Sequence, residues 1–222
     1  MRGDLRITLQ LTIVALLLSV SPAMAQNQQS TGTRSVSKGS QQPLTVGGKF
    51  RYFANESFRP GVFLVAGFYT GLAMANPPKA YPREWRQGAA GFGRNYGDFI
   101  ASWTAVQGGK FIAASALHED PRYIRSSSRN LFARAFHAVS FAVIDKSDTG
   151  HNRPALSNVA GAFAGDFVGN AYLPDGCNDV AHGLQRSALA LSGFATSNLV
   201  DEFRPEIRKI GHKLKIPFID KF

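Results

Sequence analysis

The sequence that decides the fold runs from Arg86 to Tyr123 and reads RQGAAGFGRNYGDFIASWTAVQGGKFIAASALHEDPRY. A small residue recurs at every fourth position along most of it: Ala89, Gly93, Gly97, Ala101, Ala105, Gly109 and Ala113. Residues four apart lie on the same side of a helix, so the pattern predicts one long helix with a slowly spiralling stripe of Gly and Ala. Such a stripe allows the backbone of another helix to approach closely. A break at Gly108-Gly109, giving two helices, is the alternative.

Composition divides the 222 residues into three parts. Residues 1–25 have the pattern of a cleaved signal peptide, with two Arg near the start, an apolar run from Ile7 to Val20, and Ala at the −3 and −1 positions before Gln26. The apolar run is short for the alternative, an uncleaved membrane anchor. Residues 26–43 are polar with almost nothing to bury, which predicts a disordered spacer. Residues 44–222 are predicted to form a single helical domain with a basic C-terminal tail.

The charge balance indicates what the exported protein would meet. The formal net charge is +10, and removal of two Arg and one Asp with the signal peptide leaves +9. Because an exported protein rarely meets nucleic acid, this balance favours anionic lipid or a polyanionic envelope polymer as partner, with general solubility as the plain alternative. The single cysteine, Cys177, is either buried or available to a second copy in a homo-oligomer. We therefore expect an exported protein, periplasmic or associated with the outer membrane.

The rest of the chain predicts a compact all-α bundle of five or six helices, packed through Gly/Ala stripes. The further helices are expected over residues 60–75, 129–145, 157–173 and 179–203, while residues 44–58 could be a helix or a strand. Residues 145–154 are predicted to be a polar loop, Ser157 to cap the helix after it, and Arg204-Pro205 to end the last helix. The residues predicted to pack helices together are Gly93, Gly97, Gly161, Gly165 and Gly169.

Ionisable residues concentrate at the end of the long helix, in His118-Glu119-Asp120-Pro121-Arg122-Tyr123. As a catalytic site, Glu119 or Asp120 would act as a base and His118 as a proton carrier. As a structural cluster, Asp120 would cap the turn, Arg122 would pair with a helix carboxylate such as Asp98 or Asp166, and Tyr123 would cover the core. The structural interpretation is favoured, because capping and pairing commonly explain such clusters.

No motif predicts a cofactor or a metal ion. The five histidines form no His-Glu-x-x-His, and a single Cys excludes a thiolate zinc cage. The loop around Asp148 lacks the alternating acids of an EF-hand, and no Gly-x-Ser-x-Gly occurs. The near-match to a dinucleotide fingerprint at Gly91-x-Gly93 has no strand before it.

Four stretches together resemble a family of functionally uncharacterised exported bacterial proteins of about this length, some of them fused to carboxypeptidase-regulatory-like domains. They are Gly91-Phe92-Gly93-Arg94-Asn95-Tyr96-Gly97, His118-Glu119-Asp120-Pro121-Arg122-Tyr123, Gly169-Asn170-Ala171-Tyr172-Leu173-Pro174-Asp175 and Glu202-Phe203-Arg204-Pro205-Glu206-Ile207. The resemblance covers about residues 58–207 and departs from the family pattern at Asn95, Leu173 and Arg204. It implies export and a helical domain, and it brings no activity.

These observations predict a non-enzymatic exported envelope protein that is membrane-associated and has a structural or interaction role. The alternative is a hydrolase-like enzyme with its site around His118-Glu119-Asp120. An invaginated, ligand-sized pocket beside Asp120 would favour the enzyme, and an apolar belt with a basic rim would favour the membrane role.

Overall fold

The computed structural model describes residues 42–77 and 81–215, so the predicted signal peptide, nearly all of the spacer and the end of the tail lie outside the described residues. The elements of the described part are α2 (Val46–Phe58), α3 (Pro60–Ala75), α4 (Arg83–Arg86), α5 (Gly88–Ala116), β1 (Glu119–Asp120), α6 (Leu131–Ser140), β2 (Ile144–Ser147), β3 (Asn152–Pro154), α7 (Leu156–Asn170) and α8 (Val180–Lys213). The predicted all-α class is confirmed, with seven helices in this part rather than five or six.

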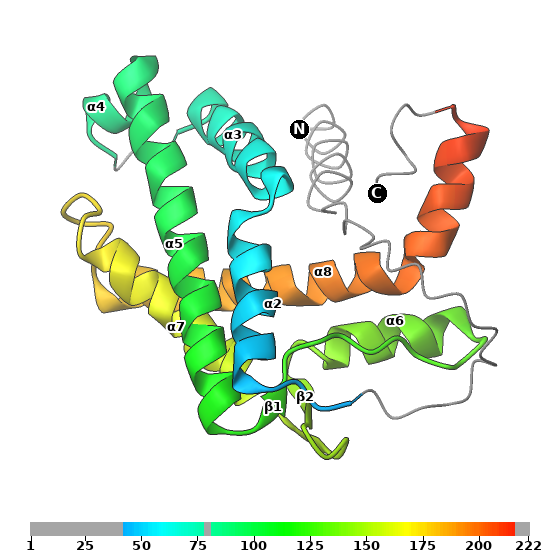
Figure 1. Ribbon diagram of the computed structural model, residues 1–222. Coiled ribbons are helices and arrows are strands. Elements are labelled where there is room, and N and C mark those ends of the chain that lie inside the picture. The colour runs from blue at the N-terminus through cyan, green and yellow to red at the C-terminus, as the bar shows by residue number, and fades with distance from the viewer. Residues whose placement is uncertain (1–41, 78–80, 216–222) are drawn as a thin grey trace.

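The long helix α5 is the centre of the arrangement, with α2 and α7 beside it and α8 passing behind (Figure 1). It runs through Gly108-Gly109 without a break and ends at Ala116, seven residues before the predicted end at Tyr123. The undecided segment before it is helical: the Thr45 side chain accepts a hydrogen bond from Gly48 N (3.1 Å) and so caps α2.

The helices α5 and α7 pack so closely that the backbone of one contacts the other at three glycines. A Cβ added at Gly165 would lie 2.6 Å from Val106 Cγ2 and 3.1 Å from the Ser102 oxygen. One added at Gly161 would lie 2.7 Å from the Val106 oxygen, and one at Gly109 would lie 3.0 Å from the Ala160 oxygen. Only glycine fits at these three positions without displacing the other helix, so the predicted stripe on α7 is a helix contact. A Cβ added at Gly169, at the end of α7, would make only ordinary contacts, with Leu173, with Arg186 of α8 and with Ser102 of α5.

The structure gives no such role to Gly93 and Gly97. No described atom outside their own helix lies within 4 Å of a Cβ built on either residue. Each step of four residues turns the helix by about 40° beyond one full turn, so Gly97 and Gly93 lie roughly 120° and 160° around α5 from Gly109. The face that meets α7 follows Ser102, Val106 and Gly109 instead, a spacing of four and three.

A small antiparallel sheet forms where the sequence predicted a polar loop and the end of the long helix. The predicted helix over 129–145 is α6 only from Leu131 to Ser140, and the predicted polar loop forms the hairpin of β2 and β3. The residues expected to end the long helix form β1, in which Glu119 pairs with Ser147 and Asp120 with Lys146. His118 makes this reversal possible, because its left-handed backbone (φ 55°) turns the chain directly after α5.

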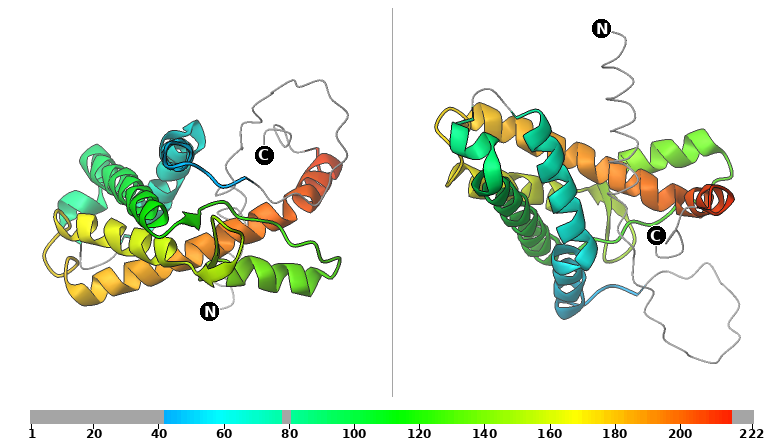
Figure 2. Two further views of the ribbon diagram at one scale, coloured as in Figure 1. Left: turned by 60° about the horizontal axis from the view of Figure 1, so that its bottom comes forward. Right: turned by 90° about the horizontal axis from the view of Figure 1, so that it is seen from above.

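The last helix does not end at Arg204-Pro205. Asp179 caps α8 as a helix start, accepting a hydrogen bond from His182 N at 2.9 Å. The helix then continues past Pro205 to Lys213, and its C-terminal part turns away from the rest (Figure 1). A proline inside a helix removes one hydrogen bond and bends the axis, and it need not end the helix. The two views of Figure 2 show α6 running beside α8, away from α3 and α4.

Candidate functional site

The three residues of the predicted catalytic cluster do not converge. The His118 side chain is 81% exposed, and its Nδ1 lies 3.7 Å from Asp148 Oδ2. Glu119 and Asp120, by contrast, are buried. Neighbours in a strand point to opposite faces, and none of the three lines either cavity described below.

Glu119 caps the start of α7. Its Oε2 accepts a hydrogen bond from Ser157 N at 2.9 Å, and its Oε1 lies 3.9 Å from Arg153 Nε. The predicted capping residue, Ser157, is instead inside the helix, and the N-cap position holds Ala155, which has no acceptor. The first N–H groups of a helix lack partners and carry a partial positive charge, so a buried carboxylate from β1 meets both needs.

Asp120 and Arg122 form an ion pair with each other. Arg122 Nε donates to Asp120 Oδ1 at 2.9 Å, Arg122 Nη2 donates to Oδ2 at 2.6 Å, and the Arg122 backbone N–H also reaches Oδ1. The predicted pairing of Arg122 with Asp98 or Asp166 is therefore wrong, although the structural role of the pair agrees with the favoured interpretation. Asp120 is nearly fully buried and the guanidinium satisfies both of its oxygens.

Asp98 and Asp166 have other partners. Tyr172 Oη donates to Asp98 Oδ1 at 2.8 Å, and Arg186 Nε lies 3.4 Å from Asp166 Oδ1. Burial raises the pKa of each carboxyl, while Tyr172 and Arg186 respectively act to lower it. In the described ranges no group of three His, Cys, Asp or Glu side chains is placed to hold a metal ion. Cys177 is buried, which is the first of the two predicted alternatives.

A buried network that the sequence interpretation missed surrounds Glu202 of α8. Its Oε1 accepts from Arg134 Nε at 2.8 Å, and its Oε2 accepts from Tyr123 Oη at 2.8 Å and from Ser126 N at 3.0 Å. Although burial alone would raise it, these hydrogen bonds lower the pKa of Glu202 below its usual value. The predicted role of Tyr123 is thus more specific than covering a core: it ties the segment after β1 to α8.

Lys49 is a second missed residue, and it lies at a helix end. Its Nζ donates to the Ala114 oxygen at 3.0 Å, in the last turn of α5, and to Asp148 Oδ2 at 2.9 Å. Only 2% of Lys49 is exposed. A cation at a helix C-terminus complements the unpaired carbonyls and the helix dipole. The helices and strands, together with the buried polar contacts that connect them, form the frame of the molecule. Three such contacts are made by Lys49, Glu119 and Glu202.

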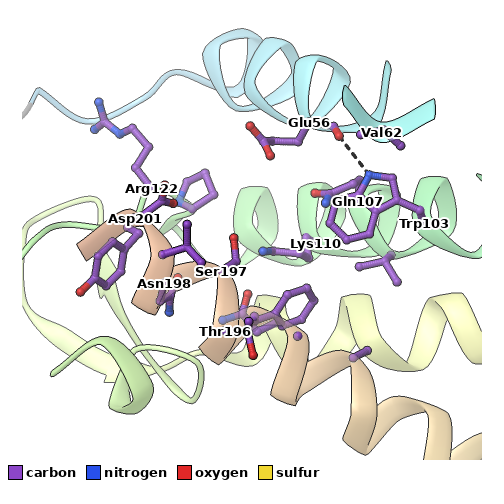
Figure 3. Close-up of a pocket in the computed structure, with 18 of the residues that line it drawn as sticks. Glu56, Val62, Trp103, Gln107, Lys110, Arg122, Thr196, Ser197, Asn198 and Asp201 are labelled. Carbon is purple, nitrogen blue, oxygen red and sulfur yellow. Dashed lines mark hydrogen bonds between the residues drawn. The ribbon is translucent and has the colours of Figure 1, made fainter. Parts of the chain in front are cut away.

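A cavity of about 620 Å³ lies between α2, α3, α5, α8 and the segment after β1, in the size range of small-molecule sites. Aromatic and aliphatic side chains form one part of its lining: Val62, Val65, Tyr69, Phe99, Trp103, Val106 and Phe194. Charged side chains form another: Glu56, Arg59, Lys110, Arg122, Arg125, Asp145, Asp201 and Arg204. Figure 3 shows Lys110 extending from α5 into the space between Glu56 on the α2 side and Ser197 on α8.

Some of the charged side chains that line this cavity have ion-pair partners, and Lys110 has none among the described residues. Arg59 pairs with Glu56 and Arg204 with Asp201. The Lys110 ammonium lies 4.4 Å from the centre of the Phe194 ring, and no described carboxylate is within ion-pair distance of it. Burial lowers the pKa of Lys110, with Asp145 and Glu56 opposing that shift, and burial raises the pKa of Asp145 to about 7.

A second cavity of about 390 Å³ adjoins the first. The two share the wall residues Tyr69, Phe99, Trp103, Val106 and Ala190. The apolar part of the first cavity thus continues toward α3 and α7.

Many large apolar side chains lie on the outer surface. Among the described residues, 23 large hydrophobic side chains are exposed, whereas only six are buried: Phe53, Val62, Val106, Leu173, Phe194 and Val200. Two regular stripes stand out. The α6 stripe consists of Phe132, Phe136 and Val139 of the helix together with Val143 in the turn after it. The α7 stripe consists of Leu156, Phe163 and Phe167, on the opposite side of α7 from its glycines.

The interior, in contrast, holds twelve buried polar residues in the described part. Six of them are ionisable: Lys49, Glu119, Asp120, Asp145, Asp166 and Glu202. No single described helix combines the length and apolar composition of a membrane span. The pair α2 and α3, which meet at 41°, meets that test only when taken together.

One sequence signal could have pointed to the cavity. Lys110 is the only charged residue between Asp98 and Glu119, in an otherwise apolar stretch of α5. A charged side chain that folding buries in an apolar stretch needs a partner or a ligand. No comparable signal marks Glu202 or Lys49, whose roles depend on segments far away in the sequence.

No family model, no curated protein and no solved structure matches this chain.

Proposed function

We propose that this protein is a non-enzymatic, membrane-associated protein of the cell envelope with a structural or binding role. One observation carries the proposal: large apolar side chains lie outside and ionisable side chains lie inside. The buried ionisable residues are mostly paired, as they also are in water-soluble domains, so the apolar exterior is the stronger part of this observation: large exposed apolar patches mark contacts with a membrane or another protein. Ionisable residues that face the interior of a helix bundle, with small residues at the helix contacts, are typical of proteins in lipid.

The energetics favour a lipid bilayer as the occupant of the two stripes. Burying one Val, Leu or Phe side chain gains about 1.5–3 kcal/mol, so covering the seven residues of the α6 and α7 stripes gains on the order of 10 kcal/mol. A second copy of the chain could cover one stripe, but the stripes lie on different helices and apolar exposure extends to α2, α3, α5 and α8 as well. The basic balance of the mature chain adds attraction to anionic lipid.

Export supports the envelope as the location. It is proposed from the signal-peptide pattern of residues 1–25 and from the resemblance to exported bacterial proteins.

The alternative, a hydrolase-like enzyme at His118-Glu119-Asp120, has less support. Glu119 caps α7 with Oε2, and Asp120 accepts from Arg122 with both oxygens. Within the described part of the chain, Glu119 Oε1 is buried without a hydrogen-bond partner, but Glu119 lines neither cavity. A general base needs a lone pair directed at a substrate, and the exposed His118 has only Asp148 beside it. Arg122 and Arg125 place the segment after this cluster at the cavity, but the three carboxyls that line it come from α2, β2 and α8.

Flotation of the purified protein with lipid vesicles tests the proposal. We expect the protein to float with vesicles of zwitterionic and anionic lipid and to stay bound in 1 M NaCl, because high salt screens surface charges and leaves apolar burial intact. A triple variant, Phe132→Ser, Phe136→Ser and Phe167→Ser, should lose this salt-resistant binding. Replacing three exposed basic residues, Arg83, Arg129 and Lys209, by Ser should lower binding only at low salt.

A wild-type protein that stays at the bottom of the gradient, as a stable monomer in buffer without lipid or detergent, would contradict the proposal. A stable oligomer in the same buffer would also do so, because the second copy would then cover the stripes.

A further inference from the structure

We propose that the 620 Å³ cavity binds a single-chain lipid anion, with its acidic head at Lys110 and its chain along the aromatic wall. The inference goes beyond membrane association and does not depend on it, since a cavity of this kind could serve in water or in lipid.

The cavity offers more positive than negative charge. Five cations line it, namely Arg59, Lys110, Arg122, Arg125 and Arg204, against three carboxyls, Glu56, Asp145 and Asp201. Arg122 is paired with Asp120, which is not in the lining, so four cations remain against the three carboxyls. Among the described atoms, the buried Nε groups of Arg59 and Arg204 have no hydrogen-bond acceptor, and Lys110 has an aromatic ring instead of a carboxylate. Buried donors normally have partners, so the two Nε groups, beside a lysine that has no described carboxylate at ion-pair distance, indicate a missing acceptor. An acidic headgroup provides it.

Lys110 is held in place by the frame. Its aliphatic stem lies against Gly161 on α7, where a Cβ would collide with Lys110 Cγ, and its ammonium lies over the Phe194 ring. A lysine with a packed stem and a head directed into a cavity is arranged for a ligand rather than for solvent. Arg59 and Arg204 are each oriented by a carboxylate three residues earlier, Glu56 and Asp201.

The other end of the cavity fits an alkyl chain. Trp103, Phe99 and Tyr69 follow one another along the wall, and the same three residues line the adjoining 390 Å³ cavity. A ligand longer than the first cavity can therefore continue into the second. A small inorganic anion would leave this apolar wall unused, and a neutral hydrocarbon would leave the cations without an acceptor.

Tryptophan quenching by a brominated fatty acid tests the inference. The chain has two Trp, and only Trp103 lines the cavities, so a Trp85→Phe background makes Trp103 the sole reporter. The full chain is kept in solution with an amphipathic polymer, which avoids competing micelles. We expect 9,10-dibromostearate to quench Trp103 saturably, and its methyl ester, which lacks the charge, to quench far less.

The matched variants are Lys110→Met, Lys110→Arg and the exposed control Lys209→Met. Loss of a charge-assisted hydrogen bond should weaken dibromostearate binding by about tenfold or more in Lys110→Met, while Lys110→Arg and Lys209→Met stay near the parent. If Lys110→Met does not fold by circular dichroism, Lys110→Gln, which keeps a polar head, replaces it with the same expectation.

Competition identifies the acidic head. Displacement of the probe by oleate or by oleoyl lysophosphatidate supports the inference, and their relative strength shows whether a carboxylate or a phosphate is preferred. Equal affinity of Lys110→Met and its parent would overturn the inference, as would equal quenching by the methyl ester. Displacement of the probe by inorganic phosphate alone would overturn the lipid class.

Discussion

The two sides of α5 show how differently the same helix can be used. Toward α7, its backbone touches the Gly161–Gly165 stripe, and added atoms have no room. Toward α2 and α8, its side chains Trp103, Gln107 and Lys110 face a cavity of about 620 Å³. The first side fixes the position of α7 against α5, and the second side places polar and aromatic side chains at a cavity that could bind a ligand.

The buried ionisable groups of the molecule differ in a comparable way. Glu202 and Asp120 belong to the frame, and each carboxylate oxygen has a donor at 2.6–3.0 Å. Lys110 and Asp145 face the cavity, and burial shifts the pKa of both toward the neutral form. A buried charge with all its partners stabilises the fold, whereas a buried charge without them is a candidate for ligand binding.

The largest expected effect is on the packed side. Gly165→Leu should destabilise by about 3 kcal/mol or more, because even its Cβ would displace Val106 and the Ser102 carbonyl. Gly97→Leu on the same central helix adds a side chain to open space and should cost nothing, since Leu forms helices better than Gly. Urea denaturation of the two variants gives the comparison. Equal midpoints would mean that the two sides do not differ as described.

The Asp120–Arg122 pair tests whether a residue that lines the cavity can belong to the frame. Arg122→Ala leaves the Asp120 carboxylate buried without its ion pair and should cost about 3 kcal/mol, the lower end for a buried pair because Arg122 is a quarter exposed. Asp120→Asn keeps the shape and an acceptor and should cost less. Arg125→Ala, in the same segment but exposed, serves as control. Wild-type midpoints for both Arg122→Ala and Asp120→Asn would revive the enzyme alternative.

The third prediction concerns Asp145 on the cavity side, whose titration should make the free energy of unfolding depend on pH. Burial raises the pKa of Asp145 to about 7, against 3.8 when unfolded, so the folded state binds the extra proton between these values. That stability is present at low pH and is lost as pH rises toward 7; between pH 5 and 8 the loss is about 2–3 kcal/mol. The groups that act on Asp145 are Lys110, Glu119, Asp120 and the Lys146 N–H.

The measurement is the difference in unfolding free energy between wild type and Asp145→Asn at the two pH values. The variant cannot ionise there and should lack this part of the pH dependence. Parallel pH profiles would show that Asp145 is solvated normally and that the cavity is not as closed as described.

The smallest effect is expected at Lys110. Replacing it with Met removes a partly desolvated charge that has no described ion pair, so stability should change by less than about 1 kcal/mol in either direction. Thermal melts followed by circular dichroism measure it. A loss as large as that of Arg122→Ala would place Lys110 in the frame and remove the distinction between the two sides.

Local patterns predicted the helices well, and they predicted the site poorly. The apolar run after Pro60, the cap at Asp179 and the glycine stripe of α7 are properties of adjacent residues, and the structure shows each of them. The prediction that Gly93 and Gly97 of α5 pack against another helix is wrong. A stripe with a period of four residues rotates slowly around the helix, so these two residues lie on a different side from the one that meets α7.

The errors near the site have a common origin in long-range contacts. Glu119 caps a helix that begins 37 residues later, and Glu202 meets Tyr123 and Arg134 from distant segments. Because the partners lie far away in the sequence, the residues next to Glu119 or Glu202 do not indicate which groups they will contact. Pro205 was expected to end α8 from local rules, yet the helix continues because one lost hydrogen bond does not outweigh the rest.

The most direct test of the central claim measures what surrounds the two apolar stripes. Nitroxide labels at Phe132→Cys, Phe136→Cys and Phe167→Cys, in a Cys177→Ser background reconstituted in vesicles, report collisions with oxygen, which concentrates in lipid, and with a water-soluble nickel chelate. We predict more collisions with oxygen than with the chelate at all three positions, and the opposite at Asn152→Cys in the exposed hairpin. Water-like collisions at positions 132, 136 and 167 would contradict a lipid-facing exterior and with it the proposed membrane association.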